Sequence, residues 1–140
     1  MTSWDIRAGQ RDDIDALLEL WRVAESVPTP TDRSESLAVL FNHDPAALIV
    51  AESEGTLVGS VIAAWDGWRG SLYRLAVRPG YRRRGLATDL VRVGEDRLRE
   101  RGAVRLAAIV AKDEEPAVEF WTARGYRFQP DHLRFTADHR

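Results

Sequence analysis

Three consecutive arginines at residues 82–84 stand directly before Gly85 and a predicted helix, and shortly after a predicted strand at residues 72–78. The start of a helix presents backbone N–H groups that have no partner within the helix, together with the positive end of the helix dipole. Gly85 and Ala87 are small enough to let an anionic ligand touch the backbone. The pattern predicts a phosphate site, and the three guanidinium groups favour a pyrophosphate.

The same stretch departs from the common nucleotide-binding motifs. Gly80 and Gly85 have the spacing of a P-loop, but Leu86 and Ala87 stand where that motif needs a lysine and a serine or threonine. The dinucleotide fingerprint G-x-G-x-x-G is absent. A nucleic-acid site would use the same arginines, yet only Tyr81 stands beside them for stacking on bases. A solvated arginine run at a helix start is the simplest alternative.

Two motifs of the chain resemble those of the GNAT N-acetyltransferases. The first includes the predicted strand and reads Leu75-x-Val77-x-Pro79-x-x-Arg82-x-x-Gly85-x-Ala87. The second lies in the last predicted helix and reads Ala117-x-x-Phe120-Trp121-x-x-x-Gly125-Tyr126. The order of the predicted elements is similar to that family over the whole chain. The turn at residues 66–71 looks especially similar to the small bacterial YpeA-type acetyltransferases.

The resemblance implies that acetyl-CoA is the co-substrate and that its acetyl group passes directly to a primary amine. In the family, the strand backbone pairs with the pantetheine arm, and the loop amides hold the pyrophosphate. The residues implied in cofactor binding are Leu75, Ala76, Val77, Arg82, Arg83, Arg84, Gly85, Leu86, Ala87, Thr88 and Trp121. The resemblance also implies a small-molecule or peptide acceptor, and a homodimer is a common assembly in the family.

The chain departs from the family where a tyrosine usually protonates the departing thiolate. By motif alignment Trp121 stands at that position, and Glu114 stands where an asparagine is usual. Tryptophan has no ionisable proton to give, so we expect Trp121 to pack against the cofactor arm. This departure keeps a second function open, an acyl-CoA-binding regulatory domain with weakened catalysis. A nucleic-acid-binding module is the third alternative.

The pKa of a primary amine is about 10.4, so the amine is protonated at neutral pH. It must lose this proton before its nitrogen can attack a thioester. Asp66 is our candidate base, since it precedes the strand that enters the cofactor site, although an aspartate before Gly67 is also typical of a β-turn. Tyr73, on that strand, is a second candidate for moving a proton. Ser60 and Ser71 lie in no G-x-S-x-G elbow, so we expect no acyl-serine intermediate.

The elements that would position these residues follow from the spacing of apolar residues. Strands are predicted at residues 3–7, 48–51, 57–65, 72–78 and 104–111, with a closing strand or hairpin at 126–128 and 133–135. Helices are predicted at residues 14–21, around 37–41, from 84 to the cap Gly102, and at 116–124. They predict one α/β (α+β) domain over residues 1–140, with a single mixed, largely antiparallel sheet and helices on both faces. The resemblance implies the same, the GNAT acyl-CoA N-acyltransferase fold.

The long third helix has its own pattern. Its inner face is predicted to hold Leu86, Leu90, Val93 and Leu98. Gly94 lies inside it, where glycine lowers helix stability by about 1 kcal/mol relative to alanine. We interpret Gly94 as a point where the helix packs closely on the sheet.

Composition excludes several kinds of site. The chain has 140 residues, no cysteine and three separated histidines, so no disulfide, thiolate site or metal centre is expected. No apolar run is long enough for a membrane span, and the first residues lack the pattern of a signal peptide. We therefore expect a cytoplasmic protein with neither a membrane nor a nucleic acid as partner.

The net charge of −2 conceals an uneven distribution. Residues 1–68 hold 4 basic and 12 acidic side chains, a net of −8, whereas residues 69–105 hold 11 basic and 4 acidic, a net of +7. The basic part contains the predicted phosphate site. The resemblance makes the acidic part much of the acceptor cleft, and a negative field attracts cations. A small cationic amine, or a peptide with a basic end, is the predicted acceptor, with Asp66 as a candidate anchor.

Overall fold

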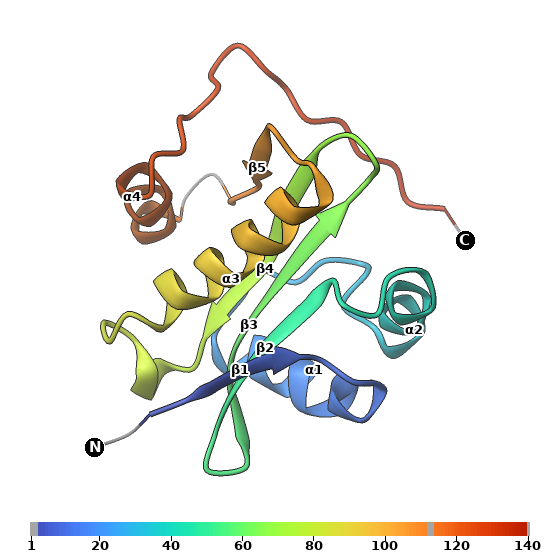
Figure 1. The fold of residues 1–140 in the computed structure, drawn as a ribbon, viewed down its shortest axis with the longest axis vertical. Coiled ribbons are helices and arrows are strands. Elements are labelled where there is room, and N and C mark those ends of the chain that lie inside the picture. The colour runs from blue at the N-terminus through green and yellow to red at the C-terminus, as the bar shows by residue number, and fades with distance from the viewer. Residues whose placement is uncertain (1–2, 112–113, 140) are drawn as a thin grey trace.

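The computed structural model describes residues 3–111 and 114–139. In this part of the chain five strands form one sheet in the order β1-β2-β3-β4-β5 (Figure 1), with bounds Asp5–Ala8, Leu48–Ser53, Thr56–Trp65, Gly70–Val77 and Leu106–Ala108. The pairs β1–β2, β2–β3 and β3–β4 are antiparallel, and β5 runs parallel to β4. The predicted mixed, largely antiparallel sheet is confirmed.

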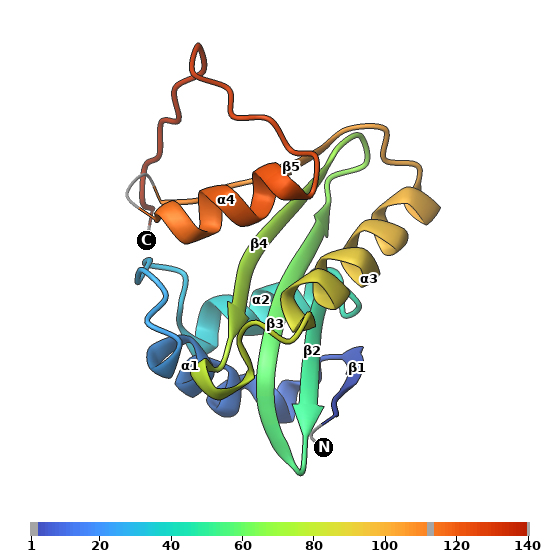
Figure 2. The ribbon, with the colours of Figure 1, turned by 90° about the vertical axis from the view of Figure 1, so that its left-hand side faces the viewer.

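Helices cover both faces of this sheet. α1 (Ile14–Val23) and α2 (Ser34–His43) lie on one face, and α3 (Leu86–Arg101) lies on the other (Figures 1 and 2). α4 (Glu115–Ala123) follows β5 and lies toward the α3 side of the core. Short 3-10 helices at Arg11–Asp13 and Pro79–Tyr81 follow β1 and β4. Among the described residues, no helix is long and apolar enough to cross a membrane.

Each face of the sheet has its own apolar core. Successive residues of β2 alternate between them: Leu48 and Val50 pack toward α1 and α2, while Ile49 and Ala51 pack toward α3. All four are at most 4% exposed. A strand buried on both faces has a continuous apolar sequence instead of an alternating one, which explains the run from Leu48 to Ala51.

α3 connects β4 to β5 and packs closely on β3 and β4. A Cβ at Gly94 would lie 3.0 Å from Leu72 Cδ2 and 3.5 Å from Ala63 Cβ, so the predicted close approach is confirmed. The prediction for Val93 is wrong, because its side chain is 39% exposed while Val91 is only 1% exposed. A helix turns about 100° per residue, which places residue 93 at the rim of the stripe formed by residues 86, 90, 91, 94 and 98.

The closing strand or hairpin predicted at residues 126–128 and 133–135 is a second wrong prediction. In the described range 114–139 the chain after α4 contains no strand, and Phe128, Leu133 and Phe135 are 81%, 82% and 88% exposed. Apolar alternation produces a strand only where another strand edge is available for pairing. β5 is also shorter than the predicted strand at 104–111, so it offers little edge, and the C-terminal segment runs past it unpaired (Figure 1).

α4 is fixed to the core by aromatic contacts. Trp121 is 7% exposed, and its ring meets the rings of Phe120 and Tyr126 edge-to-face at centroid distances of 5.4 and 4.9 Å. The Tyr126 hydroxyl donates a hydrogen bond of 2.7 Å to Glu95 Oε2 on α3. Trp121 thus packs against aromatic rings of the protein itself, and its predicted contact with the cofactor arm stays a prediction.

The orientation of α3 predicts unequal effects of two valine truncations. Val91→Ala should lower the free energy of unfolding by about 2 kcal/mol, because it removes two buried methyl groups. Val93→Ala, the matched control, should lower it by less than about 1 kcal/mol. Equilibrium unfolding in urea measures both values. Equal losses in the two variants would contradict the orientation.

The Tyr126–Glu95 contact predicts a loss of stability in alkali. Burial, and next the hydrogen bond to Glu95, raise the pKa of the Tyr126 hydroxyl well above its usual 10.0. The folded state therefore favours the protonated hydroxyl, whose stabilisation is complete below pH about 10 and is lost as the pH rises through the folded-state pKa. Tyr126→Phe should flatten the fall in unfolding free energy above pH about 10. Parallel curves for wild type and Tyr126→Phe would refute the effect.

Candidate active site

The pairing between β4 and β5 is short. It joins residues 70–72 to residues 106–108, and β4 then continues to Val77 beyond the last β5 partner. In the described part of the chain, the edge of β4 at residues 73–77 therefore has no strand beside it on this side. An extended ligand with amide groups can add to such an edge as a further strand would. Leu75, Ala76 and Val77, the residues predicted to pair with the cofactor arm, lie on this unpaired edge.

A bulge interrupts β4 just before this edge. Ser60 pairs with Ala76, whereas Ile62 pairs with Tyr73, so two residues of β4 oppose one residue of β3. Arg74 lies in the bulge with φ of 52°, in the left-handed region that non-glycine residues seldom occupy. Such backbone persists only where the surrounding contacts hold it.

Buried hydrogen bonds support the bulge from the α1 side. The Ser60 hydroxyl donates to Arg74 O at 2.9 Å and accepts from Trp21 Nε1 at 2.9 Å. The Ser60 side chain is fully buried. Because its hydroxyl already donates and accepts, Ser60 is poorly placed to attack a thioester.

The start of α3 is open to a ligand. Gly85 is the N-cap residue with φ of 89°, and no side chain caps the helix. The first helical hydrogen bond runs from Asp89 N to Gly85 O at 3.0 Å, so the N–H groups of Leu86, Ala87 and Thr88 have no acceptor within the helix. A Cβ at Gly85 would meet no atom within 4 Å. Free donors, the helix dipole and open space together make an anion site.

The three arginines before this helix have different surroundings. Arg82 Nε donates to Val77 O at 3.2 Å and its Nη2 donates to Ala24 O at 3.0 Å, so this side chain fastens the loop to β4 and to the end of α1. The Arg84 guanidinium lies 5.4 Å from the centroid of the Tyr81 ring. Arg83 is exposed. Within residues 3–111 and 114–139 none of the three forms an ion pair, so their charge is available to an anion.

α4 adds a fourth arginine that was not predicted from the sequence. Arg124 Nη1 donates to Thr88 Oγ1 at 2.5 Å, and its guanidinium lies 5.3 Å from the centroid of the Phe120 ring. Thr88 belongs to the first turn of α3, so Arg124 brings positive charge to the same helix start. The one signal in the sequence was a basic residue directly before Gly125 of the second motif.

The two candidate catalytic residues lie apart, Asp66 in the turn before β4 and Tyr73 in the middle of that strand. Asp66 lies in the turn before β4, where Oδ1 accepts from Arg69 N at 2.7 Å and from Trp68 N at 2.8 Å. These backbone donors, Arg69 first, hold the pKa of Asp66 below its usual range. Tyr73 lies beside the bulge. Tyr73 is therefore near residues 75–77 on the same strand, whereas Asp66 is separated from them by most of the length of β4.

Comparison with known proteins identifies the family. The model of the acetyltransferase (GNAT) family matches residues 14–126. An acetyltransferase of Yersinia pestis (strain Pestoides F) is 36% identical over 125 residues, 89% of each chain.

Two solved structures have a similar fold. PaiA N-acetyltransferase from Thermoplasma acidophilum, in complex with coenzyme A, has a TM-score of 0.78 at 16% identity over 93% of each chain. Ard1 from Thermoplasma volcanium has a TM-score of 0.77 at 20% identity over 90% of this chain and 84% of that one. The chain belongs to the acetyltransferase (GNAT) family.

Proposed function

We propose that this acetyltransferase takes the acetyl group from acetyl-CoA and passes it directly to a primary amine. The observation that carries the proposal is the free edge of β4, which leads to the uncapped start of α3. Acetyl-CoA has two matching parts, an extended arm with two amides and a pyrophosphate. The neighbour PaiA is described in complex with coenzyme A, which supports the same donor.

We assign each part of the donor to one part of this arrangement. The pyrophosphate would lie on the amides of residues 86–88, with charge from Arg83, Arg84 and Arg124 around it. The arm would extend along residues 75–77, and the thioester would lie toward the bulge. The amine nitrogen then attacks the thioester carbon, the C–N bond forms, the C–S bond breaks, and the amine proton leaves. No acyl-enzyme is needed, in line with the occupied hydroxyl of Ser60.

The attacking amine must lose its proton, and Tyr73 is the candidate relay that we carry forward, its oxygen accepting the amine proton while its own hydroxyl proton passes to solvent. It is half-buried and lies beside the bulge, where the thioester is expected. Asp66 is engaged by two backbone donors in a turn at the far end of β4. The buried Trp121 supplies no proton, so we assign protonation of the thiolate to solvent or to the proton released by the amine.

The acceptor that we propose is a cationic amine or a peptide with a basic end. Two of the 12 acidic residues within 1–68, Asp32 and Asp44, pair with arginines from outside this range, Arg74 and Arg97, which the net of −8 does not count. The field on an acceptor is therefore weaker than the net of −8 indicates. The acids without such a pair in the described residues still favour a cation.

The donor site predicts different effects of one substitution at the two ends of α3. Gly85→Glu should weaken acetyl-CoA binding by at least about a hundredfold, because it places a carboxylate before the free amides. Gly102→Glu is the matched control, since Gly102 also has a positive φ, of 107°, and open space around its Cβ position. Calorimetric titration with acetyl-CoA measures both. Unchanged binding in Gly85→Glu, or equal losses in the two variants, would remove the site from α3.

The catalytic assignment predicts that Tyr73→Phe lowers kcat by about tenfold or more and changes its pH profile. Asp66→Asn should leave both within about twofold, because Asp66 caps a turn. Thiol release with a panel of polyamines, basic peptides and acidic amino acids measures these rates. A strong loss in Asp66→Asn would restore Asp66 as the base, and a preference for acidic acceptors would refute the electrostatic argument.

The same panel separates the alternatives. Binding of acetyl-CoA without thiol release from any amine would favour the regulatory domain that Trp121 left open. A gel-shift assay against mixed oligonucleotides tests the third function. Tight binding that weakens steeply with salt, and that acetyl-CoA does not displace, would favour a nucleic-acid module.

A further inference from the structure

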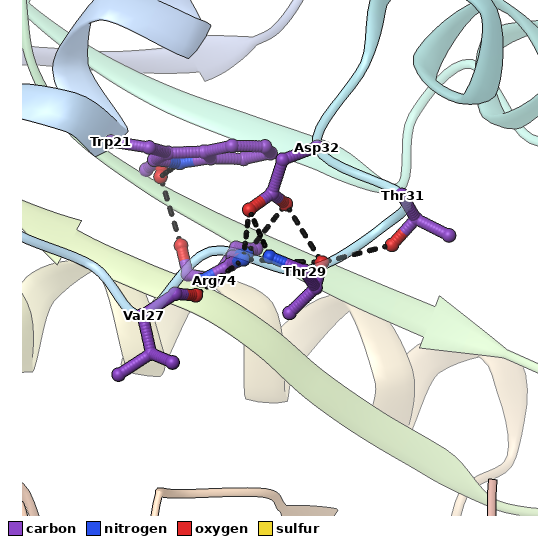
Figure 3. Close-up of polar contacts among 7 residues, drawn as sticks. Trp21, Val27, Thr29, Thr31, Asp32 and Arg74 are labelled. Carbon is purple, nitrogen blue, oxygen red and sulfur yellow. Dashed lines mark hydrogen bonds and ion pairs between the residues drawn. The ribbon is translucent and has the colours of Figure 1, made fainter.

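Arg74 joins β4 to the segment between α1 and α2 through several contacts (Figure 3). Its Nε donates to Asp32 Oδ1 at 3.0 Å, and its Nη2 pairs with Asp32 Oδ2. Nη2 also donates to Val27 O at 2.9 Å and to Thr29 Oγ1 at 3.2 Å. The guanidinium lies 5.2 Å from the centroid of the Trp21 ring, a distance typical of a cation–π contact. One side chain of the bulge thus holds three positions of the segment.

Asp32 is engaged from both sides. Besides Arg74, its carboxylate accepts from the Thr29 N–H at 3.0 Å and from the Thr29 hydroxyl at 3.1 Å. The Asp32 and Arg74 side chains are only 17% and 16% exposed. Removing one member of a largely buried ion pair leaves the other charge without compensation, so the pair holds its geometry more strictly than a surface pair does.

The start of the segment is held by backbone hydrogen bonds to α1, from Glu25 N to Arg22 O and from Ser26 N to Trp21 O, both at 3.1 Å. Residues 24–33 contain Pro28 and Pro30, which have no N–H to donate. A second connection to the site comes from Arg82, whose Nη2 donates to Ala24 O. The position of the middle of this segment therefore depends mainly on Arg74 and Asp32.

The location of Arg74 connects this segment to acetyl transfer. Arg74 directly precedes residues 75–77, the edge proposed for the cofactor arm. A donor with its pyrophosphate on α3 would carry its thioester along this edge toward the bulge. The segment 24–33 lies on the face of the sheet away from α3 (Figure 2). It therefore borders a side from which an amine can approach without crossing the donor.

We infer that Arg74 is a positioning residue for the acceptor. Through Asp32 it holds the segment 24–33 against the bulge of β4, and this segment forms one wall of the site that receives the amine. Arginine keeps its charge at every accessible pH, so Arg74 acts on the shape of this wall and moves no proton itself. The inference rests on the proposed acetyl transfer.

The test compares Arg74→Ala with Arg97→Ala. Arg97 is an equally buried arginine, 12% exposed, whose Nη2 pairs with Asp44 at 2.6 Å and whose Nη1 donates to Ala63 O at 2.7 Å, outside the proposed site. Hydrogen exchange of residues 24–33 should become at least about tenfold faster in Arg74→Ala and stay unchanged in Arg97→Ala.

Steady-state kinetics gives the functional half of the test. Arg74→Ala should raise the KM for the best amine of the panel by about tenfold and leave the KM for acetyl-CoA within about twofold. Arg74→Lys, which keeps the charge and loses the two-pronged contact, should restore part of the acceptor KM. Arg97→Ala should leave both KM values unchanged even if it lowers stability.

Any of four results would overturn the inference. Unchanged exchange in Arg74→Ala would show that the pair does not hold the segment. Equal changes of both KM values, or the same changes in Arg97→Ala, would reduce Arg74 to general stability. If the wild type acetylates no amine, the proposed function fails and the positioning role fails with it, while the exchange data still show whether the pair holds the segment.

Discussion

The separation of β4 from β5 is the constraint on which the site depends. Parallel strands need a long crossover, and here the crossover contains α3. The crossover leaves the carboxyl end of β4, so the start of α3 must lie near that end. Because the two strands pair over only three residues, the same end of β4 also keeps a free edge. A hydrogen-bonding edge and an anion site are therefore neighbours for topological reasons.

The bulge at Arg74 links the two faces of the sheet. From the α1 side, Trp21 and Ser60 hold the carbonyl of Arg74, and Asp32 holds its guanidinium. Toward α3, Leu75 and Val77 pack against the core that contains Leu86 and Leu90. Distortion of one strand thus links the edge proposed for the donor to the segment 24–33, which come from parts of the chain far apart in sequence.

Much of this architecture could be predicted from sequence because it depends on local patterns. The buried run in β2 and the glycine with free amides at Gly85 need only neighbouring residues to be recognised. The prediction of a strand in the C-terminal segment was wrong because a strand needs a partner edge, and the short β5 offers little of one. The contacts of Arg74 and Arg124 were not predicted from the sequence for a related reason. Their partners, Asp32 and Thr88, are 42 and 36 residues away in the chain.

The uneven charge of the sequence has a partly structural origin. Arg74 and Arg97 belong to the basic part of the chain, and both pair with aspartates of the acidic part, Asp32 and Asp44. Each of these largely buried pairs joins one positive and one negative charge. Part of the net charge of −8 in residues 1–68 and of +7 in residues 69–105 is therefore neutralised inside the fold. The arginines at 82–84 form no such pair within the described residues. Part of the positive charge that stays unpaired after folding therefore lies at the start of α3, where an anionic donor would bind.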